Sequence, residues 1–133
     1  MPDRLDQTGA RVVDLVDDLR QRIDAAQAPL DAQHADELVD LEERIERYGL
    51  RRSLLTDLAT RHKRQVRTLR RQELRFGLAT LAGRYRDVLA THPEPTRVIA
   101  GLDAIQEAAD DLIRNPGEEL LLLGLLLQLP PLR

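Results

Sequence analysis

Few side chains of this 133-residue chain have the type and spacing that chemistry requires. The histidines His34, His62 and His92 are far apart and show none of the short spacings typical of metal ligands. His62 falls in line with apolar residues at helical spacing, which favours a core or boundary position over a ligand or a base. The chain has no cysteine, so disulfides and thiolate sites are excluded.

Motifs that bind phosphate or transfer protons are also absent from the sequence. It contains neither the GxxxxGK phosphate loop nor GxGxxG. Acidic pairs such as Asp17-Asp18 and Asp110-Asp111 point about 100° apart on a helix and usually form a solvated face. Function must be argued from a site, so we expect no enzyme activity, no cofactor, no metal and no small-molecule substrate.

One charged segment stands out, the basic run at residues 61–75. Its cations recur at helical spacings of three and four, and they are Arg61, Lys63, Arg64, Arg67, Arg70, Arg71 and Arg75. Such a stripe could follow a phosphate backbone. It lacks interleaved aromatic residues, which stack on bases. The favoured interpretation is a solvated face, partly neutralised by the acidic N-terminal segment, with DNA bound only indirectly or weakly.

The distribution of charge leaves a second possibility open for this run. The net charge of −3 combines −7 over residues 1–50, +8 over residues 51–92 and −4 over residues 93–133. Either these segments neutralise one another within the fold, or the basic face meets an acidic partner.

Composition and periodicity predict a single all-α domain over residues 1–133. Apolar residues make up 42% and aromatic residues 2% of the chain, so the core must be aliphatic. We expect a five-helix bundle, with helices at about 8–28, 31–48, 51–91, 96–114 and 116–129. Pro29 should end or kink the first of these helices. Gly49 should close the second.

The third helix is expected to be long and kinked, because its apolar stripe shifts phase between Leu69 and Leu74. Ala79 and Gly83 should let another helix approach it. His92-Pro93-Glu94-Pro95 should stop it. The fourth helix should turn a set of apolar residues inward, namely Val98, Ile99, Leu102, Ile105, Ala109, Leu112 and Ile113.

The last helix should start at Asn115-Pro116, with Asn115 as N-cap and Pro116 at the first helical position. Residues 120–129 are apolar on nearly all sides, which predicts the central helix of the bundle with Leu123 and Leu126 in its core. This apolar run is too short for a transmembrane helix, which needs about 20 residues. The N-terminal residues do not resemble a signal peptide.

Two motifs carry a resemblance to a known family. The first is Tyr85-Arg86-Asp87, which follows the basic helical segment and is continued by Val88 and Leu89. The second is Asn115-Pro116, followed by the leucines of residues 120–129. Together, over about residues 35–130, they resemble the C-terminal domain of the delta prime subunit of the bacterial DNA polymerase III clamp loader. In both motifs the matching residues are mostly structural.

The resemblance implies a helical collar domain that packs in a ring with other clamp-loader subunits in the cytoplasm. The assembly would load the sliding clamp on primed DNA in replication, using ATP bound by the partner subunits. Family members carry two further N-terminal domains, for which this chain has no room. We therefore expect a fragment, a truncated form or a stand-alone collar-like protein. The alternatives are a nucleic-acid-binding helical module using residues 61–75 and a self-associating helical bundle.

Overall fold

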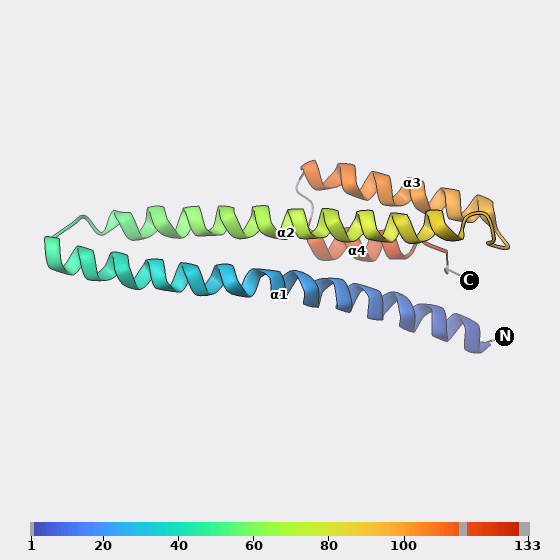
Figure 1. Ribbon diagram of the computed structural model, residues 1–133, viewed down its shortest axis with the longest axis horizontal. Coiled ribbons are helices and arrows are strands. Elements are labelled where there is room, and N and C mark those ends of the chain that lie inside the picture. The colour runs from blue at the N-terminus through green and yellow to red at the C-terminus, as the bar shows by residue number, and fades with distance from the viewer. Residues whose placement is uncertain (1, 115–116, 131–133) are drawn as a thin grey trace. The chain divides into compact units, whose positions relative to one another are not determined.

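The computed structural model describes residues 2–114 and 117–130, and the side chains among these except residues 2–13, 15, 16 and 119. Within these ranges the chain forms four α-helices and one 3₁₀ turn (Figure 1). They are α1 (Pro2–Tyr48), α2 (Ser53–Val88), α3 (Pro95–Asp111), η1 (Leu112–Arg114) and α4 (Glu118–Leu126). The described residues contain no β-strand, so the all-α fold class is confirmed. The predicted count of five helices is not.

The count differs because the helices expected at about 8–28 and 31–48 are one helix, α1, with Pro29 inside it. Proline has no N–H to donate and normally breaks or kinks a helix. Here the Gln27 side chain donates to the Asp31 carboxylate across the proline, at 3.2 Å. Asp31 is therefore part of a continuing helix and does not cap a new one.

Internal contacts divide the chain into two compact units, one of Gln21–Glu73 and one of Met1–Arg20 with Leu74–Arg133. Both α1 and α2 run from one unit into the other. The boundary in α2 coincides with the phase shift of its apolar stripe.

The unit Gln21–Glu73 is an antiparallel hairpin made of the end of α1 and the beginning of α2. Gly49 closes α1, as predicted: its φ is 65°, a conformation that favours glycine, and its N–H donates to the Ile45 carbonyl at 2.9 Å. Ile23 and Leu58 are buried in this unit. A few aliphatic side chains and the polar contacts described below hold the two arms together.

In the other unit, the end of α2, the helices α3 and α4 and the segment after α4 supply the aliphatic core. The buried apolar residues are Leu74, Leu78, Tyr85, Val98, Ala104, Ile105, Ala108, Leu112, Leu122, Leu125, Leu126 and Leu129. The predicted stop at residues 92–95 is confirmed. His92 is buried there and its Nδ1 accepts from the Glu94 N–H at 3.0 Å, after which Pro95 begins α3.

Several residues expected in this core are exposed instead. Ile99 and Ile113 lie on the solvent side of α3 and η1, and Leu123 lies on the solvent side of α4. The reason is that α4 is packed on one side only, through Leu122, Leu125 and Leu126. Because residues 120–129 are apolar on nearly all sides of the helix, the sequence predicted that all sides would be buried. The described part of the chain contains no element that covers the side of α4 that carries Leu123.

The start of α4 also differs from the prediction. The helix begins at Glu118 and its N-cap is Gly117, whereas the sequence placed the N-cap at Asn115. The Gly117 carbonyl accepts the first helical hydrogen bond, from Leu121 at 3.0 Å. Asn115 and Pro116 themselves lie outside the described residues.

Close approaches occur at glycines other than the predicted one. Ala79 is exposed, and a Cβ added at Gly83 would meet nothing within 4 Å. At Gly77 the added Cβ would collide with a methyl group of Leu19, and at Gly101 it would lie 2.9 Å from the Cδ of Pro130. The close approach that matters most is the one at Gly101, because the proline ring cannot rotate away as a leucine methyl can.

We expect Gly101→Ala to lower the free energy of unfolding by about 1–3 kcal/mol, because overpacking against Pro130 outweighs the helix propensity gained. The matched control is Gly83→Ala in α2, which meets no neighbour and should be stabilising by up to about 1 kcal/mol. Urea denaturation followed by circular dichroism measures both. Equal stabilisation by the two substitutions would show that Pro130 shifts to accept the added methyl group without any loss of stability.

Candidate functional site and interaction surfaces

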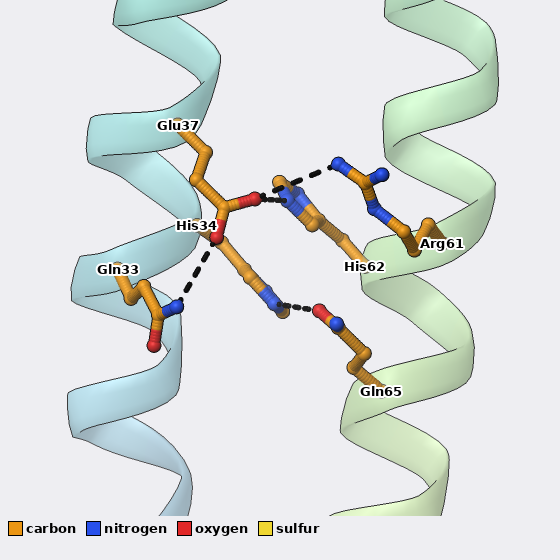
Figure 2. Close-up of polar contacts among 6 residues, drawn as sticks. All are labelled: Gln33, His34, Glu37, Arg61, His62 and Gln65. Carbon is orange, nitrogen blue, oxygen red and sulfur yellow. Dashed lines mark hydrogen bonds and ion pairs between the residues drawn. The ribbon is translucent and has the colours of Figure 1, made fainter.

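A stacked pair of histidine rings lies between the two arms of the hairpin Gln21–Glu73. His34 comes from α1 and His62 from α2, and their ring centroids lie 3.7 Å apart with an angle of 11° between the planes. His34 is buried and His62 is half-buried. Figure 2 shows the two rings between the helices, each reaching a polar partner on the opposite arm.

Each ring is fixed by a hydrogen bond through its Nε2 atom. His34 lies 2.7 Å from the Gln65 side-chain carbonyl, and His62 lies 3.0 Å from the Glu37 carboxylate. Because a carboxylate oxygen only accepts, the His62 ring carries a hydrogen on Nε2. The tautomer of His62 is therefore set by its partner across the hairpin.

Glu37 is the centre of the charge in this cluster. It accepts from His62, accepts from Gln33 at 3.2 Å and lies 3.8 Å from an Arg61 guanidinium nitrogen (Figure 2). The hydrogen bond from His62 lowers the pKa of Glu37 most, the bond from Gln33 and the nearby positive charges lower it further, and partial burial opposes them. The lowered pKa favours the ionised form of the Glu37 carboxylate.

In the part of the chain that the structure describes, no three His, Asp or Glu side chains are grouped so that they could hold a metal ion. The cluster is therefore a set of polar contacts that joins α1 to α2.

We expect the stability of the chain to fall in acid partly because Glu37 becomes protonated. Its pKa is lowered below 4.5 in the folded chain, so its contribution is present above that value and is lost as pH falls through the folded pKa. Urea denaturation at about pH 6 and about pH 3 should show a smaller pH dependence for Glu37→Gln than for the unmodified chain. Glu42→Gln, at an exposed position of α1, is the control and should leave the dependence unchanged.

The basic run does not form one uniform face. Arg70 turns to α1, where one guanidinium nitrogen donates to Asp24 and to Gln27, both at 2.8 Å. Arg61 lies beside Glu37, and Arg71 is half-buried. For Arg61 and Arg70 the predicted neutralisation by the acidic N-terminal segment therefore occurs.

The remaining cations of the run are exposed. They are Lys63, Arg64 and Arg67 in the hairpin, and Arg75 in the other unit. Among the described side chains, none forms an ion pair with Lys63, Arg64 or Arg67. We call these three residues the cationic row. Their positions follow from the turn of α2, which places them away from the face that carries His62.

The Tyr85-Arg86-Asp87 motif divides into a buried anchor and two exposed charges. Tyr85 is buried in the unit that contains α3 and α4, and its hydroxyl donates to the Pro130 carbonyl. Burial raises the pKa of Tyr85 to about 12, so the hydroxyl remains a donor at neutral pH. Arg86 and Asp87 are exposed. The position of Tyr85 is therefore structural.

We expect Tyr85→Phe to lower the free energy of unfolding by about 1–3 kcal/mol, because the buried Pro130 carbonyl would lose its partner. Tyr48→Phe is the matched control, because Tyr48 is exposed at the end of α1, and it should change stability by less than about 0.5 kcal/mol. Thermal and urea denaturation measure both. An unchanged midpoint for Tyr85→Phe would mean that the hydrogen bond adds no net stability.

An exposed apolar surface lies on α4 and at its end. Leu120, Leu123 and Leu127 are spaced three and four residues apart and are 76%, 45% and 86% exposed. We call them the leucine face. The sequence contained this spacing, but the run of leucines around it hid which positions would face solvent. An outward stripe of exposed leucines is typical of a binding site for another protein.

Comparison with known proteins identifies no relative. No protein-family profile matches the chain, and neither a curated protein nor a solved structure matches it. Among the described residues, no helix has the length and apolar content needed to cross a membrane.

Proposed function

We propose that the chain is a non-catalytic assembly domain, similar to the collar domain of a clamp-loader delta prime subunit. In this role it packs against other clamp-loader subunits in the cytoplasm and supports loading of the sliding clamp in DNA replication. ATP is bound by the partner subunits and not by this domain. The single observation that carries the proposal is the leucine face, since the residues behind the family resemblance are largely structural.

The free energy gained by burying the leucine face is comparable to the cost of forming a protein contact. Full burial of one leucine is worth about 1.5–3 kcal/mol. Leu120, Leu123 and Leu127 together therefore supply several kcal/mol toward the cost of association, which is itself at least about 4 kcal/mol. Alone they give only a weak contact. A partner must add contacts around them, as a neighbouring subunit in a ring would.

The Tyr85-Arg86-Asp87 motif supports the same proposal in a different way. Tyr85 fixes the end of α2 to the segment after α4 through Pro130. Arg86 and Asp87, on the next two positions, are exposed charges of opposite sign. Opposite charges on a fixed backbone give orientation and specificity to a protein contact more than they give affinity.

We expect the chain to co-purify with the other clamp-loader subunits of the organism that encodes it. A triple substitution of Leu120, Leu123 and Leu127 to Gln should abolish co-purification and leave the midpoint of urea denaturation nearly unchanged, because these side chains are exposed. The matched control changes three exposed apolar residues of the hairpin, Leu38, Val39 and Tyr48, to Gln and should retain binding.

Failure of the unmodified chain to bind any clamp-loader subunit would contradict the proposal. The leucine face also favours one other candidate, self-association, in which a second copy covers the same leucines. Light scattering of the purified chain distinguishes the two. A stable homo-oligomer that the Leu120, Leu123 and Leu127 substitutions dissociate, with no binding to loader subunits, would select self-association.

A further inference from the structure

We infer that the cationic row of α2, Lys63, Arg64 and Arg67, binds the phosphodiester backbone of nucleic acid weakly and without regard to sequence. The inference starts from the ion pairs between the two arms of the hairpin. The cations that point toward α1 are matched there, Arg70 by Asp24 and Arg61 by Glu37. The cationic row points elsewhere and has no acidic partner among the described side chains.

The spacing of the row suits a line of phosphates. Arg64 and Arg67 are three residues apart and rise about 4.5 Å along the helix axis. Lys63 lies beside them on the same exposed side of α2. Arginine offers a planar fork of donors that matches phosphate oxygens, and lysine adds a compact charge. One strand backbone can therefore meet two or three of these side chains while α2 lies along it.

The neighbours of the row favour nucleic acid over an acidic protein. Thr60 and Thr68 flank the row, and their hydroxyls donate to the carbonyls of Thr56 and Arg64 within the same helix, each at 3.0 Å. No apolar side chain lies between the cations in sequence except Val66, which is half-buried on another side of α2. Protein interfaces have an apolar core, whereas nucleic-acid interfaces are polar, wet and positively charged.

The same surroundings limit the strength of the contact. The α1 arm of the hairpin is rich in exposed carboxylates, such as Asp31, Asp36 and Glu43, and the net charge of the chain is −3. Both repel phosphate at long range. No tryptophan, tyrosine or phenylalanine lies beside the row to stack on bases. Contacts with phosphate alone do not read base identity. The contact is therefore weak and is made with the sugar–phosphate backbone.

Fluorescence anisotropy of a labelled DNA duplex, titrated with the full chain, tests the inference. We expect a Kd of roughly 10⁻⁵ M near physiological salt, the range of non-specific binding. Three phosphate contacts predict a slope of about −2.7 for the logarithm of affinity against the logarithm of salt concentration. A fourfold rise in salt should therefore weaken binding about 40-fold. Duplexes of unrelated sequence should bind alike.

A charge-reversed variant with Lys63, Arg64 and Arg67 each changed to Glu should lose at least tenfold in affinity. The matched control reverses Arg22, Arg47 and Arg52, three exposed cations of the same hairpin, and thus makes the same change in net charge. It should retain most of the binding. Circular dichroism of both variants checks that the helices are intact, and Arg64→Lys should restore most of the affinity that Arg64→Glu removes.

Several results would overturn the inference. Equal loss in both charge-reversed variants would show a general effect of net charge. Binding that does not depend on salt, or no binding at low salt, would remove the phosphate contact. Stronger binding to a poly-glutamate peptide than to DNA would assign the row to an acidic protein. None of these results bears on the leucine face, so the inference and the proposed assembly role stand or fall separately.

Discussion

Contacts between the two arms of the hairpin Gln21–Glu73 allow α1 to continue through Pro29. Because α1 is continuous there, polar side chains on both sides of Pro29 face α2. An interior proline costs a helix about 3 kcal/mol. Arg70 fixes the turn before Pro29 through Gln27, and the buried His34 fixes the turn after it through Gln65. Burial of Ile23, which is fully enclosed, adds about 1.5–3 kcal/mol. Together these contributions are large enough to offset the proline.

The same contacts fix the register of the two arms, which apolar side chains alone would fix poorly. Aliphatic residues recur along both arms, so a shift of one arm by a turn would still bury leucine or valine. It would not keep His34 stacked on His62, because the ring centroids meet at 3.7 Å only in one register. Hydrogen bonds of defined direction, such as the one from His62 to Glu37, discriminate among registers that burial leaves nearly equal in energy.

The sequence predicted those features that depend on neighbouring residues. α1 ends before Gly49, and α2 ends before residues 92–95. Both ends follow from the conformational preferences of glycine and proline. Features that depend on distant residues were mispredicted or missed. Pro29 ends no helix, because the opposite arm supports the turns around it. Leu123 is exposed, because periodicity records which side chains are apolar and not whether an element exists to cover them. The pairing of His34 with His62 follows only once residues 21–73 are known to fold as one hairpin.

The leucine face and the cationic row differ in the physics of the contacts that they can make. Burial of Leu120, Leu123 and Leu127 releases water from apolar surface, and salts excluded from protein surfaces strengthen such burial. Contacts of Lys63, Arg64 and Arg67 with phosphate release counterions and weaken as salt rises. The two surfaces therefore respond to ionic strength in opposite directions. A domain with both kinds of surface can remain bound to a protein partner through its leucines while its contact with a polyanion forms and breaks. Under the two proposals, the protein contact would therefore persist while the contact with nucleic acid is exchanged.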